Sequence, residues 1–412
     1  MDDKYQAAVD ALKKHGSKSA AARALGISRS ALRDRLSSSG APATQPNAIH
    51  QQLREAERKL AQVERENLTT QQIREYIFGL GEWRPKTPEW VNNRRDYPYH
   101  HGVPTLFLSD LHQGEVVEAE KVFGANEFNS KISERRIKHV VDSAINLTYG
   151  ILKDPKFPGI VLALGGDNVT GTIHEEIVVG SDRAIMSQTL DIADILHACI
   201  LKLRKHYGKV FVVGVAGNHG RTTRKPSFKF YAETNFDWLV YQMLERYFQA
   251  EIAAGQIVFL TPAAQDVTFV VANRRFRLSH GDQFRGGDGI IGPLGPITRG
   301  NNKKRSMALS LPTEGEQYDT LMVGHFHQLY QSHKLIINGS TKGFDEYALA
   351  NNFEYEPPQQ ALFLTHDQFG INHWMPVLAE APRAPSKGAP WCAWKGNKVH
   401  QHADMGWVNA AA

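Results

Sequence analysis

Cysteine is scarce in this chain, which has Cys199 and Cys392 as its two cysteines among 412 residues. Two cysteines exclude the disulfide framework that holds small secreted domains together. They also exclude a zinc site built from four thiolates. The sequence therefore predicts a protein of a reducing compartment, and we expect a cytoplasmic location.

Long apolar runs are also absent. No stretch approaches the roughly 20 residues that a helix needs to cross a bilayer, so no membrane partner is expected. The first residues, Met-Asp-Asp-Lys-Tyr-Gln, lack the basic start and apolar core of a signal peptide. Hydrophobic residues are 42% of the chain and charged residues 22%, the balance of a folded globular protein. The length predicts two or three structural units.

The net charge of +5 is concentrated at one end of the chain. Residues 1–40 contain eight lysines and arginines against four aspartates, so nearly the whole excess lies in the first tenth of the sequence. Such a distribution indicates a local basic module rather than a diffuse solubility charge.

Residues 3–36 are predicted to form three short helices. Gly16 ends the first helix, Gly26 makes a tight turn after the second, and Ser28 is placed to cap the third. The run Ala-Ala-Arg-Ala-Leu-Gly-Ile-Ser within this segment resembles a bacterial helix-turn-helix of the Fis-like type. In such a motif the third helix enters the major groove of DNA, which gives four candidate DNA contacts: Arg29, Ser30, Arg33 and Arg35.

A second interpretation of residues 1–40 stays open, namely a small helical docking or dimerisation module with a solvated basic face. DNA binding is favoured because the charge, the turn and the helix cap agree. We therefore expect residues 1–40 to be a helix-turn-helix module with DNA as its partner.

Residues 41–78 are expected to contain a flexible linker and an amphipathic helix. Between 49 and 67, core positions recur with alternating spacings of four and three residues, and Asn67 occupies the last of them. This pattern favours either a short coiled coil, which would make the protein a homodimer, or a helix packed on its own main domain. Residues 79–102 are predicted to be an extended segment leading into that domain, and residues 381–412 a loosely ordered tail.

Between 103 and 380, short apolar runs alternate with segments of helical periodicity. The runs predict strands at 103–108, 160–164, 210–216, 266–271, 275–279, 320–323 and 334–337, and the periodic segments predict helices near 133–152, 185–206 and 232–254. Two sheets with flanking helices would accommodate so many strands in one domain. The expected fold class is therefore α/β (α+β).

Polar side chains follow five of these strands. Asp110 and His112 come after the first, and residues two apart on a strand project to the same side, so both can aim at one point. The other four strand ends carry Asp167, Asn218 with His219, His280, and His325 with His327. A single such histidine is more often structural. Five polar groups at the strand ends of one domain, with glycines that allow close approach, indicate a shared metal site.

In chain order the segments are Asp-x-His at 110–112, Gly-Asp at 166–167, Gly-Asn-His at 217–219, the single His280, and Gly-His-x-His at 324–327. This series resembles the five signature blocks of the calcineurin-like metallophosphoesterase family. The resemblance covers roughly residues 103–345 and implies a four-layer αββα sandwich with two metal ions at the strand ends. Within the family, Ser-Asp-Leu-His-Gln-Gly at 109–114 is most similar to the nuclease subunit of double-strand-break repair complexes.

Carried over residue by residue, the resemblance implies seven metal ligands: Asp110, His112 and His327 on one ion, Asn218, His280 and His325 on the other, and Asp167 bridging the two. Mixed oxygen and nitrogen ligands suit Mn²⁺, which we favour, or Fe²⁺ or Zn²⁺. His219, beside the site without an ion of its own, would protonate the leaving oxygen as a general acid.

One position departs from the family pattern. The family carries an acidic residue after Gly-Asn-His, which often orients the histidine, and this chain has Gly220 there. We expect Asp182, Glu175, Glu176 or another residue to orient His219 instead; the alternative is a His219 that is less well tuned.

Two groups of basic residues bear on the substrate. Arg221, Arg224 and Lys225 follow Gly-Asn-His directly. A second group lies in the long insertion before His325, which its glycines and prolines predict to be a mobile loop: Arg299, Lys303, Lys304 and Arg305. Such clusters can bind a polyanionic backbone, and a solvated loop is an equally good interpretation.

Three functions fit these features. The first is a metal-dependent phosphodiesterase acting on DNA, to which the helix-turn-helix delivers it. The second is a phosphomonoesterase or small-nucleotide phosphodiesterase in which the N-terminal module serves only assembly. The third, a non-enzymatic DNA-binding protein on a degenerate scaffold, is disfavoured by the complete ligand set. The first is favoured because the basic module and the first signature block both point to nucleic acid.

Overall fold

The computed structural model describes residues 3–37, 87–92, 101–152, 155–284, 294–311 and 316–381 of the chain. The chain divides into two compact units, Met1–Arg84 and Pro85–Ala412, and each is described by itself. The heptad helix expected at 49–67, and the homodimer prediction that depends on it, lie outside the described residues, as does the tail after 381. No helix within the described ranges is long and apolar enough to cross a membrane.

The described part of the N-terminal unit consists of three helices: α1 (Asp3–His15), α2 (Lys18–Ala24) and α3 (Arg29–Ser37). The hydroxyl of Ser17 caps α2 by accepting a hydrogen bond from the Ala20 amide at 3.2 Å. The hydroxyl of Ser28 caps α3 in the same way, at 3.1 Å from the Ala31 amide. Mostly small side chains fill the core between the helices: Ala8, Ala21, Ala22 and Leu32. The prediction of three helices is confirmed.

The larger sheet of the second unit has six strands in the order β11-β10-β1-β2-β3-β4. The bounds are Val103–Leu108 (β1), Ile160–Leu164 (β2), Val210–Gly214 (β3), Ile257–Leu260 (β4), Gln359–His366 (β10) and Gly370–Leu378 (β11). Strands β1 to β4 run parallel, whereas β10 pairs antiparallel with both β1 and β11. Every residue of β1, β2 and β3 is buried, as expected for parallel strands covered on both faces.

The smaller sheet has five strands in the order β5-β6-β7-β9-β8. The bounds are Asp266–Val271 (β5), Arg274–Ser279 (β6), Thr320–Val323 (β7), Tyr330–Gln331 (β8) and Leu335–Ile337 (β9). Strands β6, β7 and β9 run parallel, and the two edge strands are antiparallel to their neighbours.

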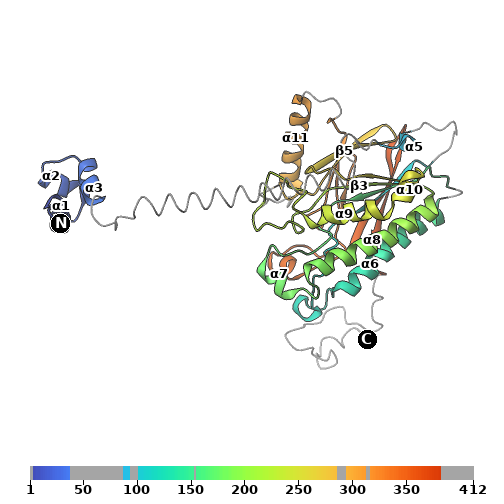
Figure 1. Cartoon of the computed structure of the whole chain (residues 1–412), viewed down its shortest axis with the longest axis horizontal. Coiled ribbons are helices and arrows are strands. Elements are labelled where there is room, and N and C mark those ends of the chain that lie inside the picture. The colour runs from blue at the N-terminus through green and yellow to red at the C-terminus, as the bar shows by residue number, and fades with distance from the viewer. Residues whose placement is uncertain are drawn as a thin grey trace, which may run out of the picture. The chain divides into compact units, whose positions relative to one another are not determined.

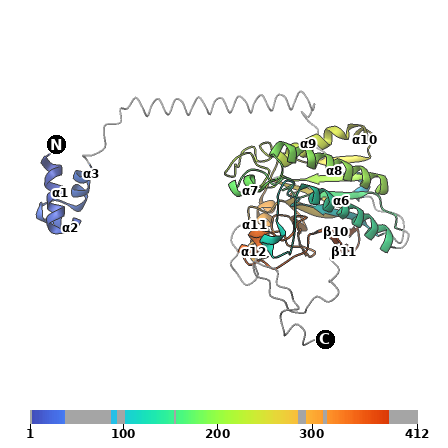
Figure 2. The same ribbon diagram turned by 90° about the horizontal axis from the view of Figure 1, so that it is seen from below.

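The two sheets face each other across an apolar layer to which both contribute large side chains, among them Phe211, Phe363, Phe269 and Phe276. The other face of the larger sheet packs against α6 (Ser130–Asn146), α8 (Ile185–Tyr207) and α9 (Phe236–Tyr247). Figures 1 and 2 show α6 and α8 side by side on this face. On the opposite side, α11 (Leu294–Ser310) packs on the smaller sheet. The four-layer αββα arrangement and the α/β class are confirmed.

Short helical segments connect these layers. They are α5 (Glu89–Asn92), η1 (Ala119–Val122), η2 (Leu147–Ile151), α7 (Glu175–Gly180), α10 (Gln249–Ala253) and α12 (Glu346–Ala350). The helix predicted near 232–254 is divided into α9 and α10. The predicted strands do not include β4, β8, β10 and β11.

The prediction of a loop before His325 is wrong for residues 294–310, which form α11. Its Pro296 falls in the first turn of the helix, where proline removes no helical hydrogen bond. Its Gly300 allows close packing, since a Cβ at this position would lie 2.2 Å from the Phe284 ring. Both residues are therefore compatible with a helix, although the glycine and proline content of the segment predicted a loop.

Candidate metal centre

The structure brings together all eight residues of the expected centre, which follow β1 (Asp110, His112), β2 (Asp167), β3 (Asn218, His219), β6 (His280) and β7 (His325, His327). The carboxyl ends of parallel strands meet at one edge of a sheet, and ligands bind at such edges. Because two sheets are stacked here, residues from both converge on the same place.

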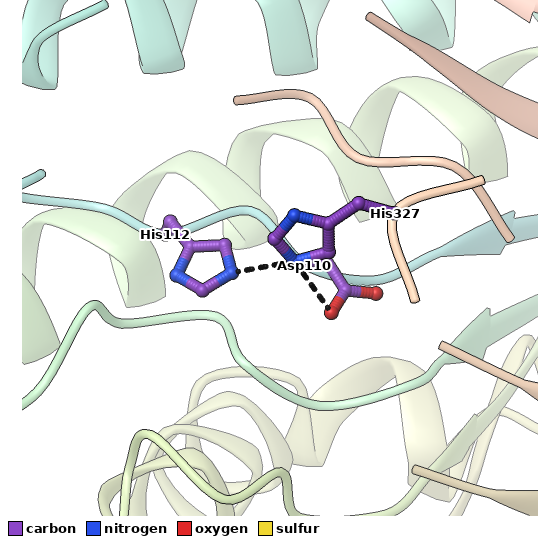
Figure 3. A group of neighbouring side chains, drawn as sticks. All are labelled: Asp110, His112 and His327. Carbon is purple, nitrogen blue, oxygen red and sulfur yellow. Dashed lines mark hydrogen bonds and ion pairs between the residues drawn. The ribbon is translucent and has the colours of Figure 1, made fainter. Parts of the chain in front are cut away.

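The first cluster consists of Asp110, His112 and His327 (Figure 3). The Nε2 atoms of His112 and His327 lie 3.1 Å apart, and Nε2 of His327 lies 3.3 Å from Oδ1 of Asp110. The same carboxylate accepts hydrogen bonds from the His325 amide at 2.9 Å and from the Ser109 hydroxyl at 2.5 Å. A fixed, buried carboxylate and two imidazoles that face one point can hold a metal ion.

The second cluster consists of Asp167, His280 and His325, and one ligand atom of each lies within 4.8 Å of the others. Nε2 of His280 lies 3.1 Å from Oδ2 of Asp167 and 3.0 Å from Oδ1 of Asn218. Nδ1 of His280 is 2.8 Å from the Gly165 carbonyl, which can only accept a hydrogen bond, so Nδ1 donates. This contact leaves Nε2 for the cluster.

His219 lies between the two clusters and can join a third ligand group with His112 and Asp167. Its ring centroid is 4.7 Å from that of His112, and its amide donates a hydrogen bond to Oδ1 of Asp167 at 2.7 Å. Nδ1 of His219 donates to the Thr170 carbonyl at 2.8 Å. Its Nε2 is therefore the nitrogen left for a metal ion or a proton transfer.

None of the three acids Asp182, Glu175 and Glu176 orients His219; another residue does so, through the Thr170 carbonyl. Asp182 instead accepts hydrogen bonds from the amide and hydroxyl of Ser130. Glu175 pairs with Arg224 at 2.9 Å, and no contact between Glu176 and His219 occurs among the described side chains. A backbone carbonyl fixes the same tautomer as a carboxylate would, but it adds no full charge.

Five of the candidate ligands have a left-handed backbone conformation: Asp110, His112, Asp167, His325 and His327, with φ between 47° and 68°. They are half of the ten non-glycine residues with positive φ in the described ranges. Each such residue costs about 1–3 kcal/mol, and strain of this kind gathers at functional sites. The explanation that Asp110 and His112 converge as strand residues is wrong, because β1 ends at Leu108 and both lie beyond it.

Two glycines of the motifs are required by close approach. A Cβ at Gly217 would lie 2.1 Å from Oδ1 of Asp167, and a Cβ at Gly324 would lie 2.5 Å from Oδ2 of Asp110. Neither distance is sterically allowed, so each glycine lets the next motif pack directly against a carboxylate.

Burial and neighbouring charges set the protonation of the cluster. Burial, and then the charge of Lys342, lower the pKa of His112 to about 4. Burial and the charge of His280 lower the pKa of His325 to about 3. Both imidazoles are therefore neutral near pH 7, the form that binds a metal ion. Burial opposes the charged form of His280, but the charge of Asp167 raises the pKa of that imidazole to about 10.

Glu115 was not identified from the sequence, although it follows His112 by three residues. Its Oε2 accepts a hydrogen bond from the Thr170 hydroxyl at 2.7 Å and lies 3.3 Å from Nδ1 of His112. Its Oε1 pairs with Lys342 at 3.0 Å, and Lys342 also pairs with Asp345 at 2.5 Å. Glu115 thus contacts both a candidate ligand and the residue that positions His219.

Asp237, at the start of α9, was also missed, because its place near the helix N-terminus reads as an ordinary cap. Its buried carboxylate accepts hydrogen bonds from the amides of Asp167 and Gly217, both at 2.8 Å, and of Asn168 at 3.0 Å. Burial and the charge of Asp167 raise the pKa of Asp237 to about 6. The carboxylate joins the loops that follow β2 and β3.

The donor set fits divalent metal ions. Each cluster combines carboxylate oxygens with imidazole nitrogens, and Asn218 adds an amide oxygen. This mixture of donors suits Mn²⁺, Fe²⁺ and Zn²⁺. The neutral imidazole of His112 and the short distance between the Nε2 atoms of His112 and His327 also agree with an ion between them.

Of the four cations in the insertion before His325, two make contacts within the folded domain. Lys304 pairs with Asp266, and Arg305 donates a hydrogen bond to the Tyr318 carbonyl at 2.9 Å. In the N-terminal unit, Arg29, Ser30 and Arg33 of α3 are exposed, and Arg35 is partly exposed.

One comparison with known families bears on the N-terminal unit. The model of the bacterial regulatory protein, Fis family, matches residues 9–37, which span part of α1 and all of α2 and α3. This match supports a helix-turn-helix that binds DNA. No curated protein matches the chain.

Solved structures give only remote likenesses. Vps29 from Entamoeba histolytica, complexed with Zn²⁺, has 13% identity and a TM-score of 0.28, covering 68% of this chain and all of its own. Vacuolar protein sorting 29 from Cryptosporidium parvum has 14% identity and a TM-score of 0.25, over 64% and 85%. A conserved uncharacterized protein from Streptococcus pneumoniae, described as a predicted phosphoesterase, has 9% identity and a TM-score of 0.24, over 64% and 84%. TM-scores this low carry no inference about this chain.

Proposed function

We propose that the protein is a phosphodiesterase that uses two divalent metal ions to hydrolyse DNA, with its helix-turn-helix binding the duplex. The single observation that carries the proposal is the convergence of eight metal-binding or proton-donating side chains from five strand ends. Such a set of oxygen and imidazole donors lowers the stability of the folded chain, since it buries carboxylates and strains the backbone. Its presence therefore indicates a functional site.

The ligands divide between two sites. In the proposal, Asp110, His112 and His327 hold the first ion, and Asn218, His280 and His325 hold the second, while Asp167 lies between them. Bound divalent ions would activate a water molecule and stabilise the charge that develops on a phosphate. Three of the seven proposed ligands are oxygens, which suit Mn²⁺, and four are imidazoles, which suit Fe²⁺ and Zn²⁺, so Mn²⁺ is the first ion to test and the other two follow.

His219 is proposed as the general acid. Its Nδ1 proton is committed to the Thr170 carbonyl, so only Nε2 can deliver a proton to the leaving oxygen. The hydrogen bond from its amide to Asp167 keeps the ring beside the clusters.

DNA is the proposed substrate because of the N-terminal unit. The Fis-family match and the exposed basic side chains of α3 support duplex binding by Arg29, Ser30, Arg33 and Arg35. Binding there would raise the local concentration of phosphodiesters at the metal centre.

The test compares three substrates with added Mn²⁺: linear DNA, a nitrophenyl phosphodiester and a nitrophenyl phosphomonoester. We expect the wild type to cleave DNA and the diester, and Asp110→Asn to lose at least about 100-fold, since even outer partners of metal ligands contribute 10–100-fold. Asp142→Asn is a matched control, because Asp142 of α6 forms an exposed pair with Lys202 of α8. Strong monoester activity with intact DNA would overturn the proposal, as would no activity with any metal ion.

A further inference from the structure

The segment 221–231 begins two residues after His219 and leads back to α9. Its base is closed by a β-bridge between Arg221 and Asn235 and by a hydrogen bond from the Thr222 amide to the Thr234 carbonyl at 2.9 Å. The Phe236 amide also donates to the Gly220 carbonyl, at 2.7 Å. The segment is therefore a loop anchored beside the candidate general acid.

Hydrogen bonds within the loop order it further. The Arg221 guanidinium donates to the Thr223 carbonyl at 3.0 Å, and the Thr223 hydroxyl donates to the Lys225 carbonyl at 2.7 Å. The Ser227 hydroxyl donates to the Lys229 carbonyl at 2.8 Å. Side chains on this loop are thus presented by a defined backbone.

Both ends of the loop lie close to the metal centre. At its start, Arg221 follows His219 by two residues and forms the β-bridge with Asn235. At the other end, the Tyr231 hydroxyl donates to Oδ1 of Asp282 at 3.4 Å, two residues beyond His280. A chain bound along the loop would pass the clusters.

The loop carries four cations, Arg221, Arg224, Lys225 and Lys229, and no acid between 221 and 231. Arg224 pairs with Glu175, but both side chains are more than four-fifths exposed, so the pair is weak. Within the described ranges no carboxylate pairs with Lys225 or Lys229. The surface is positively charged next to a site that handles phosphate esters.

Two phenylalanines alternate with these cations. The Phe228 side chain is 99% exposed, and Phe230 is 45% exposed with φ of 54°. An isolated exposed aromatic ring needs no explanation. Here one ring stands fully in solvent between Lys225 and Lys229, a combination of stacking surface and phosphate-binding charge that suits unpaired nucleotides.

We propose that residues 221–231 bind single-stranded nucleic acid, with Phe228 stacking on a base and the cations contacting phosphates. This inference rests on the proposed function and names the strand form that reaches its metal centre. Bases within a duplex are already stacked, so the loop selects unpaired or frayed segments, whereas α3 binds duplex DNA.

Binding is tested in the full-length Asp110→Asn protein, so that the probe is not consumed. The probe is a labelled oligothymidine, and excess unlabelled duplex occupies the helix-turn-helix. We expect Phe228→Ala to weaken binding roughly 5- to 150-fold, since stacking on one aromatic side chain contributes about 1–3 kcal/mol. Phe369→Ala is the matched control, because Phe369 is 70% exposed in the turn between β10 and β11.

A second variant tests the charges. Lys225→Ala with Lys229→Ala should reduce the slope of log Kd against log salt by about 1.4, since each phosphate contact on a single strand contributes about 0.7. The inference would be overturned if the Asp110→Asn protein bound oligothymidine equally well with and without Phe228→Ala. Displacement of the oligothymidine by the duplex would overturn it as well. Failure of the proposed function appears separately, as absent DNA and diester hydrolysis in the wild-type protein.

Discussion

Glu115 shows how single contacts can couple two parts of the centre. Its carboxylate lies beside Nδ1 of His112 and accepts a hydrogen bond from the hydroxyl of Thr170, whose carbonyl fixes His219. Burial opposes ionisation of Glu115, but the charge of Lys342 holds the pKa of this carboxyl well below its usual value. A carboxylate paired with a ligating imidazole fixes the orientation of the ring.

Removal of this charge should weaken metal binding. We expect Glu115→Gln to lower the affinity for Mn²⁺ about 10- to 100-fold, the usual effect of losing a partner of a metal-binding histidine. Titration calorimetry on metal-free protein measures the affinity directly. Glu134→Gln is the control, because Glu134 forms an exposed pair with Lys138 on α6. Equal affinities in the two variants would refute the role of Glu115.

His219 has two possible roles that one substitution separates. As a general acid, its loss should reduce kcat about 10²- to 10⁴-fold and leave metal content unchanged. As a ligand with His112 and Asp167, its loss should reduce metal content as well. The proposal predicts that His219→Ala retains its metal ions, which elemental analysis of the purified variant measures.

At this scale the sequence predicted which side chains converge but not how. Polar residues beside glycines at strand ends identify the candidate ligands, since each such segment is only a few residues long. The left-handed conformation of Asp110 and His112 has no local signal. The pair of Glu115 and Lys342 joins residues 227 positions apart, and no pattern in one sequence reveals such a contact.

Among the elements, α11 is held on the smaller sheet by an ion cluster. Asp266 on β5 contacts both Lys304 of α11 and Arg277 of β6, and the Asp266 and Arg277 side chains are each 8% exposed. Arg277 also pairs with Glu316 at 3.3 Å. Burial would raise the pKa of Asp266, but the charges of Lys304 and Arg277 hold it below its usual value.

The cluster gives a pH-dependent prediction. Asp266→Asn should lower the free energy of unfolding at pH 7 by about 3 kcal/mol, the lower end for a broken buried pair, since Glu316 remains. Because the folded pKa is depressed, this stability is complete above the unfolded pKa of about 3.9 and is lost as the pH falls through the lower folded value. Urea unfolding of both proteins at pH 7, 5 and 3 measures it. A difference that persists unchanged at pH 3 would contradict this account.

Burial explains only part of the outcome for the elements, since β5 alternates between buried and partly buried residues and matches its predicted bounds, whereas β10 is almost wholly buried and was not predicted. Strands β1, β2 and β7 are buried throughout and match their predicted bounds. In strand β11 the buried residues are Ile371 and Val377, six positions apart, and the strand includes Pro376, so it shows no strand-like apolar pattern. Helix α11 was missed because its first turn contains Gly295 and Pro296.

For the whole molecule, the order of strands is what creates the centre. The parallel strands β1, β2 and β3 of one sheet and β6 and β7 of the other end at neighbouring edges, so five separate segments contribute to one site. The sequence could predict this through the resemblance of its motifs, since composition alone does not specify how sheets stack. The three helices of the N-terminal unit were predictable for a different reason, namely that their caps and the turn depend on residues close together in the sequence.

The most direct test of a two-ion centre is the metal stoichiometry of the intact chain. Native mass spectrometry after loading with Mn²⁺ should find two ions on the wild type, one on His327→Ala and none on Asp167→Asn, because Asp167 serves both positions. Wild-type protein that retains no ion, or substitutions that leave the stoichiometry unchanged, would contradict the proposal that these clusters form a metal centre.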